Sequence, residues 1–191
     1  NASTAGTDGG ANANPTRGVH AGGYTSPADA MGNHIDYFTI MSAGNSTDFG
    51  NLAAAIQGMA WSSSTTRGVS AGGATTPGNG TEVNTMQYIE YATTGDTSDF
   101  GDLTAVREFA CGNSNSKRGI ISGGKDHPAN ALNFIEYYSI SSLGNSADFG
   151  DLTSARTQCY NGSNGPGHGG LEDELPQRES VNYMPGSGRG F

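Results

Sequence analysis

The sequence predicts an all-β fold in which four copies of one small sheet follow each other along the chain. Three recurring features predict it: a pair of adjacent glycines in every copy, a tyrosine in register after each pair, and a phenylalanine near the end of three copies. The pairs begin at Gly22, Gly72, Gly123 and Gly169, so they are 50, 51 and 46 residues apart. A period of this size is typical of proteins that stack one supersecondary unit repeatedly.

The copies divide one repeat domain of residues 1–191 into units at 1–50, 51–101, 102–150 and 151–191. We expect their recurring residues to be structural anchors. The anchors are the pairs Gly22 and Gly23, Gly72 and Gly73, Gly123 and Gly124, and Gly169 and Gly170; the tyrosines Tyr37, Tyr88, Tyr137 and Tyr183; and the phenylalanines Phe49, Phe100 and Phe149. The sequence predicts no catalytic, cofactor-binding or metal-binding residue.

Each unit is expected to contain about four strands, because short β-branched and aromatic runs alternate with clusters of Gly, Asn, Asp, Ser and Pro. The first strand lies in the stretch after Leu52, Leu103 or Leu152. The second ends at the glycine pair, where glycine permits a positive φ or the close approach of another backbone. The third contains the tyrosine. The fourth is short and contains an Asp-Phe-Gly tripeptide, whose aspartate forms an Asx-turn and whose glycine reverses the chain.

The third strand of the third unit is apolar on both faces. Ile135 and Tyr137 face one side, and Tyr138 and Ile140 face the other. A unit of about fifty residues cannot bury two faces alone, whereas neighbouring units stacked face to face can. The pattern therefore predicts a β-propeller of four blades. We expect one closed four-bladed ring, while a ring shared between chains and an open array remain alternatives.

The composition argues against several classes of partner. Asp and Glu total 18 against 9 Lys and Arg, which gives a net charge of -9. Nucleic-acid binders need a basic face, so we expect no nucleic-acid partner. We also expect no membrane partner, because no apolar run approaches the roughly 20 residues of a membrane span. The two cysteines, Cys111 and Cys159, are expected to be small buried hydrophobic residues, with a single disulfide as the alternative.

A unit with a glycine pair, then a tyrosine, a late aromatic residue and a Leu…Arg stretch resembles the kelch repeat. Phe49, Phe100 and Phe149 stand where kelch units usually have tryptophan, and Arg107 and Arg156 match the arginine that follows. More narrowly, the string GNS-x-DFGDLT-x-A-R, with RG-x-x-x-GG, is similar to kelch-like repeats in virion structural proteins of marine tailed phages, notably those that infect cyanobacteria. The resemblance covers essentially the whole chain.

This resemblance implies a propeller fold and a structural protein of the phage virion: a tail fibre, an appendage or a capsid-surface knob. It implies a role in assembly, host-surface recognition or both, in the extracellular particle. The expected partners are other virion proteins, further copies of the chain and a host-surface glycan. The alternative is a secreted lectin-like or adhesion propeller outside a phage.

The segments after the glycine pairs are where we expect binding. They span 24–33, 74–84, 125–133 and 171–179, and they differ in length and sequence while the framework repeats. Binding residues are disproportionately found on such loops, which a rigid scaffold positions.

No arrangement of residues predicts catalysis. The Asp-Phe-Gly tripeptide also occurs in protein kinases, but here it recurs with the repeat and lacks the accompanying kinase motifs. The four histidines occupy different positions in their units and predict no metal site: His20, His34, His127 and His168. The acidic run at 172–174 fits an exposed loop better than the paired carboxylates of a glycosidase. We therefore expect no enzyme activity and no cofactor, with a hydrolase or oxidase as the least favoured interpretation.

Overall fold

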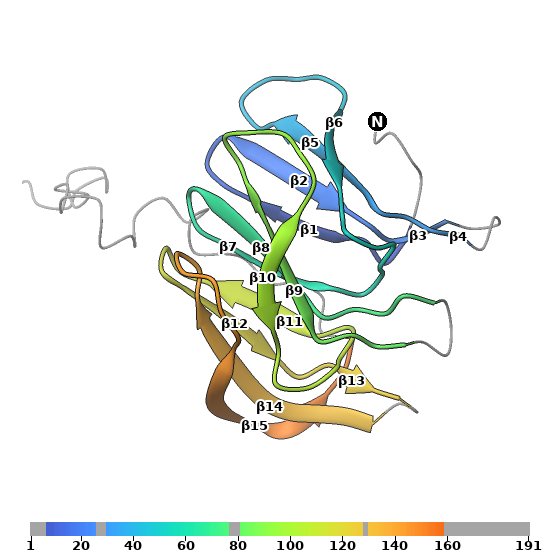
Figure 1. Cartoon of the computed structure of the whole chain (residues 1–191), viewed down its shortest axis with the longest axis vertical. Helices are drawn as coiled ribbons and strands as arrows, with labels where there is room; N and C mark the ends of the chain where they lie inside the picture. The colour runs from blue at the N-terminus through green and yellow to red at the C-terminus, as the bar shows by residue number, and fades with distance from the viewer. Residues whose placement is uncertain (1–6, 26–29, 77–80, 128–129, 159–191) are drawn as a thin grey trace, which may run out of the picture.

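The computed structural model describes residues 7–25, 30–76, 81–127 and 130–158, and the regular elements in these ranges are all β-strands. The strands form three successive antiparallel sheets and one small hairpin (Figure 1). Within these ranges no helix has the length and apolar character to cross a membrane. The predicted all-β class is therefore confirmed for the described part of the chain.

The first sheet has the order β1-β2-β5-β6, with β1 at Gly10–Ala13, β2 at Arg17–Ala21, β5 at His34–Thr39 and β6 at Thr47–Asn51. The second has the order β7-β8-β9-β10, with β7 at Ala60–Ser63, β8 at Arg67–Ala71, β9 at Thr85–Glu90 and β10 at Ser98–Asp102. In the third sheet β11, β12, β14 and β15 lie side by side, with β11 at Cys111–Ser114, β12 at Arg118–Ser122, β14 at Asn130–Ser139 and β15 at Ala147–Arg156. The short strand β13, at Lys125–Asp126, pairs with the beginning of β14.

The three sheets also share their register. The tyrosine of the third strand lies opposite the branched residue that follows the Arg-Gly of the second strand: Val19 pairs with Tyr37, Val69 with Tyr88, and Ile120 with Tyr137. In each sheet the second strand ends directly before the glycine pair. The sequence repeat therefore corresponds to a repeated backbone structure over three units. The fourth unit from residue 159 onward, with Gly169, Gly170 and Tyr183, lies outside the described residues, as do the fourth loop and Cys159.

One sequence expectation about the fourth strand is wrong. The glycine of Asp-Phe-Gly does not reverse the chain: Gly50, Gly101 and Gly150 lie within β6, β10 and β15. They accompany a register shift, which in the second sheet falls between Asp99 and Gly101. The tripeptide therefore forms a β-bulge that bends a continuing strand. The expected Asx-turn does form at Asp148, which accepts a hydrogen bond from Gly150 N at 3.2 Å.

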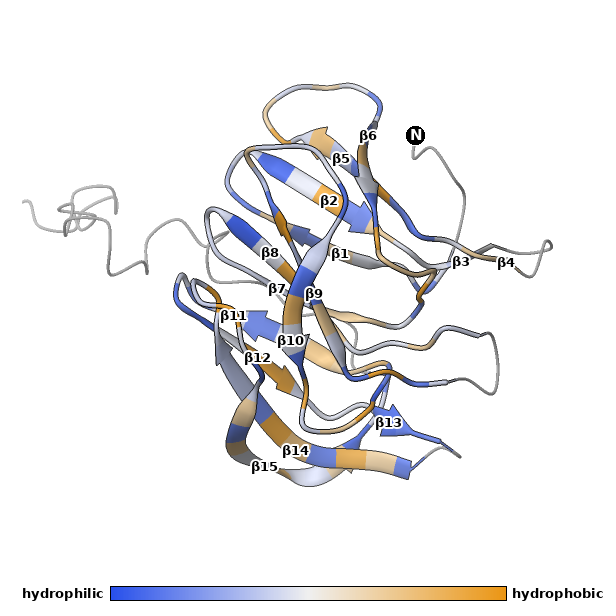
Figure 2. Cartoon of the chain, in the orientation of Figure 1, coloured by the Kyte–Doolittle hydropathy of each residue, from blue (hydrophilic) through white to orange (hydrophobic). Residues whose placement is uncertain are grey.

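The sheets pack against each other through their first strands and their broad faces. Strand β7 lies against both β1 and β11, and Ser63 Oγ donates to Ala13 O at 2.9 Å while Ser63 N donates to Ser114 Oγ at 3.0 Å. Two apolar clusters fill the spaces between sheets, one joining the first and second sheets and one joining the second and third. Figure 2 shows hydrophobic residues interspersed with hydrophilic ones along β14, and adjacent residues such as Tyr137 and Tyr138 face opposite sides of the sheet.

Candidate functional site

The glycine pairs contact the segments that lead from one unit into the next. All six glycines of the three described pairs have positive φ, between +63° and +106°. The second glycine donates its N–H to the segment that leads into the next unit, over 2.8 to 2.9 Å: Gly23 to Ile56 O, Gly73 to Arg107 O, and Gly124 to Arg156 O. A Cβ atom on Gly72 would lie 2.5 Å from Arg107 O. Both the left-handed backbone and this close approach require glycine.

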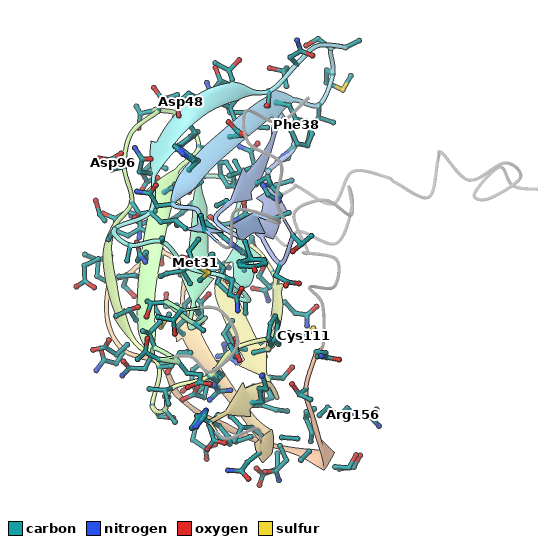
Figure 3. The ribbon with its side chains drawn as sticks, turned by 90° about the vertical axis from the view of Figure 1, so that its right-hand side faces the viewer. Met31, Phe38, Asp48, Asp96, Cys111 and Arg156 are labelled. Atoms are coloured by element: carbon teal, nitrogen blue, oxygen red, sulfur yellow. The ribbon has the colours of Figure 1, made fainter. Side chains whose placement is uncertain are left out.

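The bulged fourth strands receive a loop of the following unit. Gly95 N donates to Phe49 O at 2.7 Å, and Gly144 N donates to Phe100 O at 2.8 Å. Side chains of the same loops accept hydrogen bonds from the strand: Asn51 N donates to Asp96 Oδ1 at 2.9 Å, and Asp102 N donates to Asn145 Oδ1 at 3.0 Å. Figure 3 shows Asp48, on the first of these strands, on the same side of the molecule as Asp96.

A stack of an arginine, a tyrosine and a phenylalanine recurs on one face of every described sheet. The guanidinium carbon lies 4.4 to 4.7 Å from the centre of the tyrosine ring, and the tyrosine and phenylalanine ring centres are 5.9 to 6.0 Å apart at a steep angle. The stacks are Arg17, Tyr37 and Phe49; Arg67, Tyr88 and Phe100; and Arg118, Tyr137 and Phe149. Cation–π attraction and edge-to-face packing hold these groups.

The arginines of the stacks also bridge two sheets. Arg67 Nη1 donates to Ile140 O at 3.0 Å, and the guanidinium of Arg17 bonds to Tyr91 O. The sequence repeats this arginine before the glycine, but the sequence alone assigns it no role. Its recurrence directly before the first glycine of three units was the signal available in the sequence.

Phe149 departs from the behaviour of the other anchors. Phe49 and Phe100 are 3% and 2% exposed, whereas Phe149 is 51% exposed. The local sequence and the stack with Tyr137 are the same. Phe100 is also covered by the third sheet, where its ring centre lies 5.3 Å from that of Tyr138.

A buried ion pair lies between the second and third sheets. The guanidinium of Arg107 contacts the carboxylate of Glu136, and both side chains are almost fully buried. Burial lowers the pKa of Arg107, and the neighbouring Glu136 carboxylate opposes that change. Glu136 also accepts a hydrogen bond from Thr104 N at 2.8 Å. Because every partner belongs to the packing between sheets, the pair fits a structural role.

Two tyrosines are buried in the same spaces. Burial raises the pKa of Tyr91 and of Tyr138 well above the ordinary tyrosine value, and the hydrogen bond between Tyr138 and Ser62 opposes the rise for Tyr138. Tyrosines in such surroundings stay protonated and contribute packing rather than acid–base chemistry near neutral pH.

The segments after the glycine pairs form hairpins in the same place on each sheet. In the first unit β3, at Tyr24–Thr25, pairs with β4, at Ala30–Met31. In the second, Thr75 N donates to Thr81 O at 3.2 Å, and in the third β13 pairs with β14. Figure 1 shows all three extending to the right-hand side of the molecule. The tips at 26–29, 77–80 and 128–129 lie outside the described residues.

In the described ranges the structure shows no group of His, Cys, Asp and Glu side chains placed to hold a metal ion. Cys111 is half-buried rather than buried, and its Sγ accepts a hydrogen bond from Asn113 Nδ2 at 3.4 Å. In the described part of the chain, the outward faces of the first and third sheets expose large hydrophobic residues, among them Phe38, Ile40 and Phe149.

Comparison with known proteins gives this chain no family. No family model matches the sequence, and a search of curated proteins finds no match.

Proposed function

We propose that this chain is a kelch-like propeller protein of a phage virion, with a role in particle assembly and host-surface recognition. The observation that supports it best is the separation of a fixed framework from a variable row of hairpins. The repeated residues are used between sheets, as in the glycine pairs and the Asp-Phe-Gly bulges. The hairpins repeat in position but not in sequence.

The combination of a repeated framework with variable hairpins favours a binding function over a catalytic one. Loops on a rigid scaffold are the usual location of binding residues, and three hairpins on one side offer a broad contact surface. Their sequences are rich in hydroxyl, amide and carboxylate groups, as in ATTPGNGTE at 74–82. Such groups suit hydrogen bonding to a glycan, which is consistent with the expected host-surface ligand.

The second hairpin provides the sharpest test, and the structure limits which of its residues can be replaced. Ala74 N donates to Gln57 O at 2.9 Å, and Val83 N donates to Gly73 O at 2.9 Å, so both ends of the segment belong to the framework. Only residues 76–80 should be replaced, by an Asn-Gly turn that closes a two-stranded hairpin. We expect adsorption of phage carrying this variant to fall while the unfolding midpoint of the isolated domain stays the same.

A matched control is Leu143→Ser, in a loop between β14 and β15 that is not part of the hairpin row; Leu143 is 59% exposed. Adsorption should be unchanged in this variant. Unchanged adsorption after replacement of 76–80 would remove that hairpin from the proposed site. Binding of the purified chain to a glycan array, together with its absence from purified particles, would favour the lectin-like alternative over the virion protein.

A further inference from the structure

The first and third sheets each expose one half of the interface that joins neighbouring sheets inside the molecule. We define the trailing face of a sheet as the one with the arginine, tyrosine and phenylalanine stack. The leading face is the opposite one. It contains the first and third residues after the tyrosine of the stack: Phe38 and Ile40 in the first sheet, Ile89 and Tyr91 in the second, and Tyr138 and Ile140 in the third. Inside the chain, each trailing face packs on the next leading face.

The two internal interfaces are closed to bulk solvent and specific. Ile89, Tyr91, Tyr138 and Ile140 are each at most 3% exposed. In the second interface the rings of Phe100 and Tyr138 are 5.3 Å apart between centres, and Arg67 donates to Ile140 O. The contact therefore consists of a phenylalanine from the trailing face, two apolar residues from the leading face, and a hydrogen bond from an arginine to a backbone carbonyl.

The leading face of the first sheet and the trailing face of the third sheet have the same chemistry, but no other described sheet packs on them. Phe38 and Ile40 are each 47% exposed, and Phe149 is 51% exposed. These are among the few large hydrophobic residues that the described part of the chain exposes. Figure 3 places Phe38 near one end of the long axis and Arg156, at the end of β15, near the other.

The trailing face of the third sheet is already shaped to receive a leading face. The carbon of the Arg118 guanidinium lies 4.7 Å from the centre of the Tyr137 ring, as Arg17 does over Tyr37, and Phe149 meets Tyr137 at the same 5.9 Å as Phe49 meets Tyr37. The strand sequence around Phe149, ADFGDL, differs from that around Phe100, SDFGDL, only in its first residue. A partner would therefore meet a preorganised surface.

We propose that the trailing face of the third sheet binds the leading face of the first sheet in a second copy of this chain. Phe149 would pack on Phe38 and Ile40, and Arg118 would donate to Ile40 O, as Arg67 does to Ile140 O inside the chain. The contact is head-to-tail, because it joins two different surfaces. Repetition of such a contact gives either a closed ring or an extended array.

The remaining segment of the same chain matches the interface less well than a second copy does. The sequence around the fourth tyrosine is VNYMPG, so Met184 and Gly186 stand at the places of Phe38 and Ile40. A glycine offers no side chain where every described unit has a large apolar one.

Sedimentation velocity of the full chain tests this proposal. We expect the wild-type chain to self-associate with rising concentration, and either Phe38→Asp or Phe149→Asp to weaken association by at least about tenfold. Both residues are exposed within the chain, so the folded signal in circular dichroism should persist. Met41→Asp is the matched control, since Met41 is 85% exposed beside the leading face and its counterparts Ala92 and Ser141 are also exposed.

A mixing experiment separates head-to-tail contact from other modes of association. The Phe38→Asp chain keeps an intact trailing face, and the Phe149→Asp chain keeps an intact leading face. A mixture of the two should therefore associate although neither does alone. A wild-type chain that stays monomeric, association that survives Phe149→Asp, or a mixture that fails to associate would each overturn the proposal.

Discussion

The middle sheet and the two end sheets have the same strands and the same anchors, but they differ in how many faces are covered. In the second sheet both Ile89 and Phe100, on opposite faces, are 2% exposed. The first sheet buries Phe49 but exposes Phe38, and the third buries Tyr138 but exposes Phe149. Burial in this protein is therefore a property of a unit's neighbours, as expected for repeats that cannot bury their apolar faces alone.

The largest difference in stability should appear when the phenylalanine anchor is removed at a covered position and, in a second variant, at an uncovered one. Phe100→Ala should lower the free energy of unfolding by about 3–5 kcal/mol, because it opens a cavity between two sheets. Phe149→Ala should cost less than about 1 kcal/mol in a dilute, monomeric sample, because its ring is half in solvent. Urea denaturation measures both, and equal losses would contradict the comparison.

A glycine substitution tests whether the pairs are needed for contact between units. Gly73→Ala should destabilise by roughly 2–3 kcal/mol, since a Cβ there meets Gln57 O at 2.6 Å and the backbone has φ +106°. Gly44→Ala is the control: nothing lies within 4 Å of its added Cβ, so we expect a change within about 0.5 kcal/mol. A mild effect at Gly73, measured by thermal and urea unfolding, would argue against the tight contact.

The buried tyrosines predict an alkaline loss of stability that depends on the internal interfaces. In the unfolded chain Tyr91 and Tyr138 lose their protons near the ordinary tyrosine pKa of 10.0, whereas burial in the folded chain raises the pKa of both. The folded state therefore binds more protons than the unfolded state above pH 10, and stability must fall there as pH rises. The slope is about 1.4 kcal/mol per pH unit for each tyrosine.

Replacing both tyrosines by phenylalanine should make the free energy of unfolding depend less steeply on pH above pH 10. The contributions of the other titratable groups should stay as they are in the wild type. Urea unfolding from pH 9 to 11 compares the double variant with the wild type. If absorbance shows both tyrosines ionising near their ordinary pKa while the protein stays folded, the internal interfaces are wet and the account of their burial is wrong.

The smallest effect concerns the stacking arginines. Arg67→Ala should destabilise by about 1–2 kcal/mol, because it removes a bond to Ile140 O and an ion pair with Glu90 as well as the contact with Tyr88. Arg118→Ala should cost about 0.5 kcal/mol, since the described contact is only the one with Tyr137. Thermal unfolding of the two variants in monomeric samples measures the two losses of stability. A larger loss for Arg118→Ala than for Arg67→Ala would contradict the comparison.

The framework of the three described sheets could be predicted because its causes are local. A glycine pair that ends a strand indicates a positive φ, and an alternating Tyr-rich run indicates a strand with two apolar faces. The second strand of each described unit ends where the sequence indicated, and the tyrosines fall in one register.

The errors and omissions came from contacts between units. The glycine of Asp-Phe-Gly was expected to reverse the chain, but the strand continues through a bulge. At Gly50 and Gly101 a loop of the following unit lies against this bulge. The pairing of Arg107 with Glu136 could not be predicted, since Arg107 lies between β10 and β11, Glu136 lies in β14, and only the packing of these segments brings them together. Nothing in the local sequence distinguishes Phe149 from Phe100, because Phe100 is buried by the third sheet, which is distant in the sequence.

Native-state hydrogen exchange at the loop amides tests most directly whether each sheet depends on the next. Gly95 N and Gly144 N donate to the fourth strand of the preceding sheet, at Phe49 O and Phe100 O. If the sheets stabilise each other, both amides should exchange only through large-scale unfolding, with a free energy and a denaturant dependence close to those of β8 in the middle sheet. Exchange of these amides at the rate of exposed loop residues, while β8 remains protected, would show that the sheets are independent and would contradict the account.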